Sequence, residues 1–137
     1  MADIYESLCY CTNLRRSARM ISDYYDSELG DTGISASQYH LLMNLKLMES
    51  ANITHWARHV GLDRSTMVRN IAPLLSEGLI QQVEGHGKMY ALSEKGEAVL
   101  VKAIPVWEAA QQKINSFLGK EDADAVLRIG DKLQNLK

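Results

Sequence analysis

Five polar residues between positions 64 and 70 carry the side chains best suited to binding chemistry in this chain of 137 residues. They are Arg64, Ser65, Thr66, Arg69 and Asn70. Arginine can make paired hydrogen bonds to guanine and asparagine to adenine, and hydroxyls near a helix start suit phosphate. Their spacing alone fits two interpretations equally. They contact DNA, or they are surface polar residues, with Asp63 and Thr66 serving only as helix caps.

The two cysteines, Cys9 and Cys11, form a second reactive set. They are too few for a disulfide framework, and two residues apart on a helix they point about 200° apart, which disfavours joint ligation of a metal. A nearby arginine, Arg15 or Arg16, could lower the pKa of the Cys11 thiol and favour oxidation. Alternatively, Cys11 is a small apolar member of a helix stripe, and Cys9 is either a resolving thiol or a bystander.

Histidines add little to a metal interpretation. His55 and His59 are spaced four residues apart, and no further ligand spacing accompanies them. The sequence predicts neither a metal site nor a cofactor. It also shows no nucleophile with a matching base and no phosphate-binding loop, so we expect no enzyme.

Two short helices position the polar residues. Thr54 can cap the first, which ends at Gly61, and Asp63 can cap the second, which runs to Glu77. In the second helix Met67, Ile71 and Leu74 recur at helical spacing and are expected to face inward. Pro73 lies in the same helix and predicts a kink or loosening near its last turn.

Apolar spacing, capping residues and helix-breaking glycines also predict the segments on either side of these two helices. The apolar spacing predicts a helix over residues 4–29, ended by the glycines of 30–33, and a helix opened by the capping box of Ser35 and Gln38. Strands are expected at 79–83 and 88–92, joined by a tight tip at 84–87. A long helix starts at Ser93 or Glu94, bends at Pro105 and breaks at Gly119, and a last helix closes the chain.

Composition excludes a membrane span and a secretory signal, which predicts a cytoplasmic protein. The net charge of −2 does not by itself indicate nucleic-acid binding. Residues 53–93, however, hold four Lys or Arg against three Asp or Glu and are the most basic third of the chain.

A helix-turn-helix followed by a two-stranded hairpin is the winged-helix order. The long helices before and after it carry more apolar surface than one small core needs, which predicts a dimer interface. We therefore expect a mainly α protein with a small β-hairpin, forming a single domain over residues 1–137. Residues 35–96 would be the winged-helix lobe, and residues 1–34 and 97–137 the dimerisation helices.

At this point the sequence resembles the MarR family of transcription regulators. The resemblance is carried by Gly61–Asn70, by Pro73-Leu74, by Glu77–Ile80 and by Leu92–Gly96. It implies a homodimer that binds a palindromic operator in double-stranded DNA, represses transcription, and is released by a small molecule or by thiol oxidation. A winged-helix protein-interaction module with weak or no DNA binding is the alternative.

The resemblance also implies site residues. Wing contacts would come from His86 or Lys88, although the short tip lacks the arginine that family members use in the minor groove. Cys11 and Tyr25 have a register similar to that of the sensing cysteine and one tyrosine of organic-hydroperoxide regulators, while Arg15 stands where those proteins have a second tyrosine. An effector of unknown identity would bind where the dimerisation helices meet the winged-helix lobe. Its candidate pocket residues, which could equally be core, are Tyr25, Tyr39, Met43 and Trp107.

Overall fold

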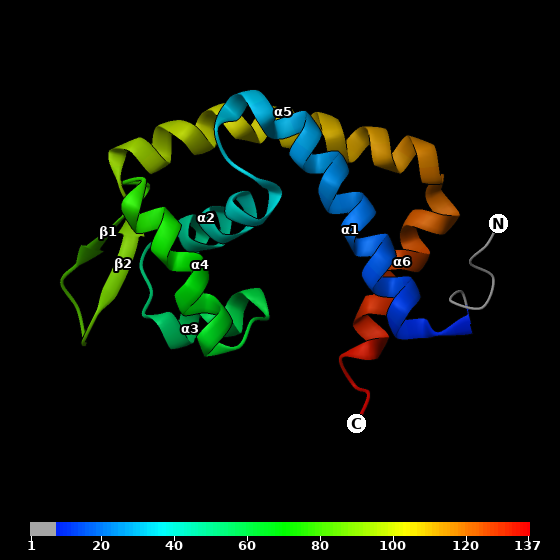
Figure 1. The fold of residues 1–137 in the computed structure, drawn as a ribbon, viewed down its shortest axis with the longest axis horizontal. Coiled ribbons are helices and arrows are strands. Elements are labelled where there is room, and N and C mark those ends of the chain that lie inside the picture. Colours follow the sequence, from blue (N-terminus) through cyan, green and yellow to red (C-terminus); the bar gives the residue numbers. More distant parts are fainter. Residues whose placement is uncertain (1–7) are drawn as a thin grey trace.

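Helix α5 (Glu94–Leu118) spans the molecule, and a group of elements lies at each of its ends (Figure 1). The computed structural model describes residues 8–137. One lobe contains α2 (Ala36–Met48), α3 (Ile53–Val60), α4 (Arg64–Ser76) and the strands β1 (Ile80–Val83) and β2 (Met89–Leu92). At the other end lie α1 (Tyr10–Leu29) and α6 (Lys120–Leu133). A 3-10 turn at Gly30–Thr32 follows α1.

The core of the first lobe is built from side chains of every helix in it. The fully buried ones include Leu42, Leu45, Trp56, Met67 and Leu74, and Leu100 of α5 belongs to the same core. Trp56 can be buried because its indole N–H donates to the Leu41 carbonyl at 3.2 Å. The inward positions expected for α4 are confirmed, since Met67, Ile71 and Leu74 are all buried.

The hairpin is antiparallel, with Ile80 opposite Leu92 and Val83 opposite Met89. A bridge fixes it to the helical layer, because Ala51 and Tyr90 exchange two backbone hydrogen bonds of 3.0 and 2.9 Å. The base of the wing is therefore held on both sides, while its tip extends away from the lobe (Figure 1).

Local capping signals predicted most helix starts correctly. Ser35 and Gln38 form the expected capping box, and Asp63 and Ser93 cap α4 and α5. The cap expected at Thr54 is wrong, because α3 starts at Ile53 and the Asn52 side chain accepts the His55 N–H at 2.8 Å. Asparagine is a strong N-cap residue, because its side-chain oxygen can accept the backbone N–H of the residue three positions later.

The first helix starts later than its apolar pattern suggested. It begins at Tyr10 with Cys9 in an extended cap conformation, and Leu8 lies in a 3-10 turn. Residues 4–7 of the expected helix lie outside the described residues. The helical spacing of apolar residues therefore continues beyond the α-helix, since Leu8 fits that spacing but lies before the helix begins.

Both helix-internal prolines are accommodated. Helix α4 continues past Pro73 to Ser76, and the Pro73 carbonyl accepts the Glu77 N–H at 2.9 Å. Helix α5 is continuous through Pro105 and arched over the molecule (Figure 1). Gly119 ends α5 as expected, with a φ of 82°. Within residues 8–137, no helix is both long and apolar enough to cross a bilayer.

Candidate nucleic-acid interface and ligand cavity

Helix α4 is held by its ends and by its buried side. Gly61 closes α3 with a φ of 77°, which a glycine adopts without strain, and this lets the chain turn sharply into α4. Asp63 then accepts the Thr66 backbone N–H at 2.8 Å and the Ser65 hydroxyl at 2.9 Å. The start of α4 is therefore fixed before any ligand arrives.

The face of α4 opposite its buried stripe is polar. Arg64, Ser65 and Arg69 are exposed, and Thr66 and Asn70 are half-buried, so all five predicted residues lie on accessible surface. The capping role also holds, because Asp63 caps α4 through Thr66 and Ser65. The two interpretations drawn from the spacing are thus compatible in one structure.

Arg64 is oriented by a neighbouring helix. Its guanidinium donates to the Thr54 hydroxyl of α3 at 2.7 Å, a contact that the sequence analysis missed because it assigned Thr54 to capping. Arg69 donates to Thr66 one turn before it, at 3.4 Å. Both cations therefore lie along the helix surface with donors to spare, since a guanidinium has five N–H groups.

Hydrogen bonding keeps Asp63 ionised. The Thr66 backbone N–H, then the Ser65 and Thr66 hydroxyls and, more weakly, the Arg69 charge hold the pKa of this carboxyl below its usual value. An ionised cap is favourable here because the helix N-terminus carries a partial positive charge.

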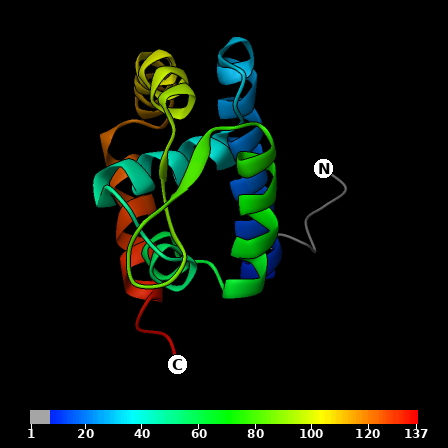
Figure 2. The same cartoon turned by 90° about the vertical axis from the view of Figure 1, so that its left-hand side faces the viewer.

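The wing tip lies on the same side of the lobe as the start of α4 (Figures 1 and 2). His86 and Lys88 are both exposed there. Gly87 has a φ of 78°, which favours glycine in a turn this tight. The interface thus combines one helix face with two wing side chains that could reach a phosphate backbone.

The four candidate pocket residues line one cavity of about 410 Å³ between α1, α2 and α5. They are Tyr25, Tyr39, Met43 and Trp107. Trp107 stacks on Tyr39 with ring centroids 5.4 Å apart and on Tyr25 at 6.1 Å. His40 and Glu108 also line the cavity, although the sequence analysis did not select them.

Both tyrosine hydroxyls are neutral near pH 7. Burial raises the pKa of Tyr25, and burial together with the Glu108 carboxylate raises that of Tyr39. The Tyr25 hydroxyl donates a hydrogen bond to the Gln111 side chain of α5. Tyr25 thereby ties α1 to α5 at the edge of the cavity.

The thiols differ from the sequence expectation. Both cysteines are exposed, so in this chain Cys11 is not a buried member of the stripe. The pKa of the Cys9 thiol is lowered mainly by hydrogen bonds from Thr12, with a smaller effect of Arg15. Tyr25 lies 14 residues after Cys11 on α1, roughly 21 Å along the axis, so the two cannot touch within one chain.

The histidines of α2 and α3 form a surface row. Asn44 contacts His40 Nδ1 at 3.4 Å and His59 Nδ1 at 3.3 Å, and the His59 ring lies edge-on to His55. Among residues 8–137, no group of three or more His, Cys, Asp or Glu side chains is arranged to hold a metal ion.

These features define a winged helix-turn-helix protein with long helical extensions. A family model described as "MarR family" matches residues 34–85, which span the helix-turn-helix and the first strand of the wing. This match shows a MarR-family domain over residues 34–85, and solved MarR-type regulators share the fold of nearly the whole chain.

The similar structures extend over nearly the whole chain. The Mycobacterium tuberculosis transcriptional regulator MosR is 28% identical over 92% of this chain and 96% of its own, with a TM-score of 0.79. MosR has also been solved with DNA, at 27% identity over the same shares and a TM-score of 0.80. The repressor CouR bound to p-coumaroyl-CoA is 20% identical over 96% of both chains, with a TM-score of 0.86, which supports the fold alone. No curated protein sequence matches this chain.

Proposed function

We propose that this protein is a transcription regulator that binds double-stranded DNA through α4 and the wing. The observation that carries the proposal is the exposed polar face of α4, which is capped at Asp63 and anchored by buried residues, beside an exposed wing tip. Arg64, Ser65, Thr66, Arg69 and Asn70 would contact the major groove, and His86 and Lys88 the backbone or minor groove. The similarity to MosR, which is solved in complex with DNA, supports this assignment.

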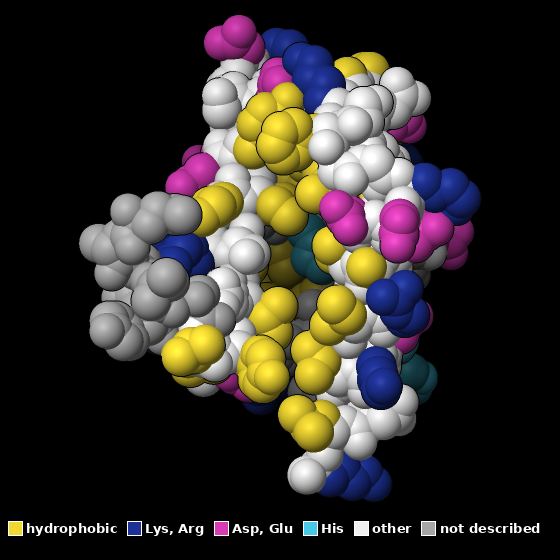
Figure 3. Space-filling model, turned by 90° about the vertical axis from the view of Figure 1, so that its right-hand side faces the viewer, with side chains coloured by type: hydrophobic (Ala, Val, Ile, Leu, Met, Phe, Trp, Pro, Cys, Tyr) yellow, Lys and Arg dark blue, Asp and Glu magenta, His cyan; other side chains and the backbone are white. Residues whose placement is uncertain are grey.

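The proposed active form is a homodimer built from residues 1–34 and 97–137, with residues 35–96 as the DNA-binding lobe. Apolar side chains gather in a long groove on the face formed by the two ends of the chain (Figure 3). The exposed apolar residues of α1, α5 and α6 include Leu14, Met20, Phe117, Val126, Leu127, Ile129 and Leu133. Exposed apolar surface of this kind marks an interaction site.

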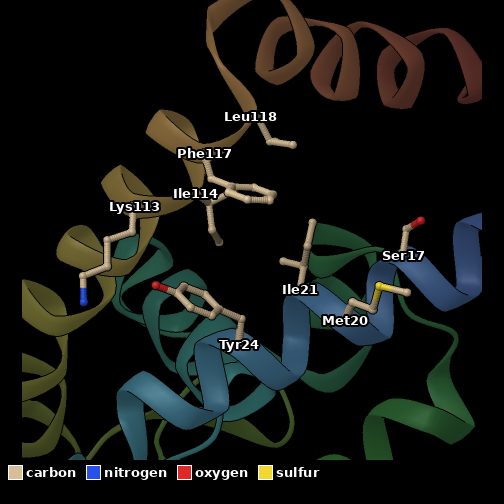
Figure 4. A pocket seen from close by; sticks show the side chains of 8 residues that line it. All are labelled: Ser17, Met20, Ile21, Tyr24, Lys113, Ile114, Phe117 and Leu118. Carbon is tan, nitrogen blue, oxygen red and sulfur yellow. The ribbon is translucent and has the colours of Figure 1, made fainter.

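The groove between α1 and α5 supports the same proposal. It has a volume of about 560 Å³, and Met20, Ile21, Ile114 and Phe117 project into it from the two helices (Figure 4). A second copy would cover this face through a two-fold axis and place two α4 helices one DNA turn apart, which requires a palindromic operator.

DNA binding is tested by fluorescence anisotropy with fragments from the region upstream of the protein's own gene, over a salt series. We expect Arg64→Ala and Arg69→Ala each to weaken binding about tenfold and to reduce the salt dependence. Lys102→Ala is the matched control, because it removes an exposed cation from α5. If both arginine variants bind like the control, α4 does not read DNA. If no fragment binds above the nonspecific level, the chain is better described as a protein-interaction module.

A repressor needs a release signal. We propose that the reacting thiol is Cys9 and not Cys11. Cys9, with its lowered pKa and exposed position, would react with a hydroperoxide, which is reduced while the thiolate becomes a sulfenate. The Cys11 thiol would then displace water and form a disulfide. Because Cys9 is the cap of α1 and Cys11 lies in its first turn, this bond would require that turn to unwind.

Mass spectrometry after one equivalent of hydroperoxide tests this step. We expect loss of two hydrogens in the wild type, trapped sulfenate in Cys11→Ser, and loss of DNA affinity that Cys9→Ser prevents. A Cys9→Ser variant that still releases DNA on oxidation would exclude Cys9 as the reacting thiol, and a Cys9→Ser/Cys11→Ser variant that does so would exclude the thiol route and leave a small-molecule effector in the Tyr25–Trp107 cavity.

A further inference from the structure

The cavity between α1, α2 and α5 is dominated by electron-rich rings. Tyr25 and Tyr39 both stack on Trp107 with interplanar angles of 8° and 14°, so the three rings are nearly parallel. Indole and phenol faces carry negative charge density and attract cations placed over them. Parallel rings also favour a flat guest that continues the stack.

The charged groups at this cavity also favour a positively charged ligand. Glu108 lines it, lies close enough to Tyr39 to raise the pKa of the phenol, and forms no ion pair within residues 8–137. Neither lysine nor arginine is among the lining residues. A bound carboxylate would thus meet a like charge without a cationic partner, which is unfavourable in a partly enclosed site.

His40 also lines the cavity. Its Nδ1 atom faces the Asn44 side-chain amide, whose nitrogen can only donate a hydrogen bond. The Nδ1 side of the His40 ring is thus engaged by Asn44. The Tyr25 hydroxyl is likewise engaged, because it donates to Gln111.

We propose that the cavity binds a planar organic cation, with the ring system stacked on the aromatic residues and the positive charge near Glu108. This deepens the function proposed above, because it names the chemical class of the effector for the same cavity. A volume of about 410 Å³ lies within the usual range of small-molecule sites.

The test uses three probes that share one ring system but differ in charge. They are 1-methylquinolinium, neutral quinoline at pH 8 and quinoline-2-carboxylate, each titrated into the DNA-free full-length protein by calorimetry. We expect the cation to bind about tenfold more tightly than quinoline, and the carboxylate more weakly than either. Equal or tighter binding of the carboxylate, or binding of none of the three, would overturn the proposal.

Glu108→Gln tests the charge directly and keeps the shape of an exposed side chain. We expect it to reduce the affinity for the cation about fivefold and to leave quinoline unchanged. Glu94→Gln is the matched control, since it removes the same charge from α5 roughly 21 Å away along the helix. If Glu108→Gln and Glu94→Gln behave alike, the carboxylate does not select the ligand.

The two proposals can fail separately. Operator binding without any probe tests the DNA-binding function, and probe binding without DNA tests the cavity. If the protein binds its operator but prefers the carboxylate, the proposed DNA-binding function stands and the proposal of a cationic ligand is wrong. If the protein prefers the cation but never binds DNA, the proposal of a cationic ligand stands and the proposed function as a DNA-binding regulator is wrong.

Discussion

Gly96→Ala is the substitution with the most direct steric consequence. Gly96 is buried in the first turn of α5, where the helix passes over the start of β1. A Cβ atom there would lie 2.0 Å from the Leu79 carbonyl oxygen and 3.0 Å from its carbon. That oxygen already accepts the Ser93 backbone N–H at 3.1 Å. The clash therefore involves backbone on both sides and cannot be relieved by a side-chain rotation.

The magnitude follows from what must move. An ordinary contact would require the helix and strand to separate by more than about 1 Å, and overpacking of this kind costs about 3 kcal/mol when backbone shifts. Weakening the Ser93 hydrogen bond adds about 1 kcal/mol, while the better helix propensity of alanine returns about 1 kcal/mol. The net loss of about 3 kcal/mol corresponds to a fall in Tm of roughly 10 °C for a chain of this length.

Thermal unfolding followed by circular dichroism, at one protein concentration, measures this fall. Gly30→Ala is the control, because Gly30 has right-handed helical angles of −43° and −46° and nothing within 4 Å of an added Cβ. We expect that variant to melt at the wild-type temperature or slightly above it. A Gly96→Ala variant that is as stable as Gly30→Ala would show that the packing of α5 on β1 is not as close as described.

Three further predictions concern single residues. Glu49→Gly should raise the stability by about 1 kcal/mol, because Glu49 adopts a strained γ-turn conformation with a φ of 68° and a ψ of −51°; an unchanged or lower Tm contradicts this. The pKa of Asp63 is lowered in the folded state, so its stabilisation is present at neutral pH and lost as the pH falls through that lowered value. The Tm difference between wild type and Asp63→Ala should thus shrink below about pH 4, and a difference constant with pH argues against an ionised cap. Thr54→Val should weaken operator binding about fivefold by freeing Arg64, with Thr54→Ser close to wild type; equal binding by both variants would show that Thr54 does not position Arg64.

Elements whose boundaries depend on neighbouring residues could be predicted from the sequence. Ser35 and Gln38 lie three residues apart and satisfy each other's backbone donors, and Asp63 does the same for Thr66. Such signals work because both partners lie within one helical turn. The same locality explains the error at α3, where Asn52 and Thr54 are both acceptable caps and only the folded chain distinguishes them.

Features that depend on contacts between distant residues were less predictable. The hydrogen bond from Arg64 to Thr54 crosses from one helix to another, and the cavity brings Tyr25 and Trp107 together from helices more than sixty residues apart. The pocket residues were chosen through a family resemblance, which supplied the packing that a single sequence does not contain. Glu108 and His40 escaped notice because charged and polar residues on a helix surface are ordinarily solvent-facing.

Helix α2 links the cavity to the helix proposed to read DNA. Tyr39 stacks on Trp107 in the cavity, and its neighbour Gln38 donates to the Glu77 carboxylate at the end of α4 at 3.2 Å. Glu77 is also held from the other side, because Lys95 of α5 donates to its backbone carbonyl at 2.8 Å. A ligand that shifted Tyr39 would therefore move a residue bonded to the end of α4, so ligand binding and DNA binding would compete for the position of one helix.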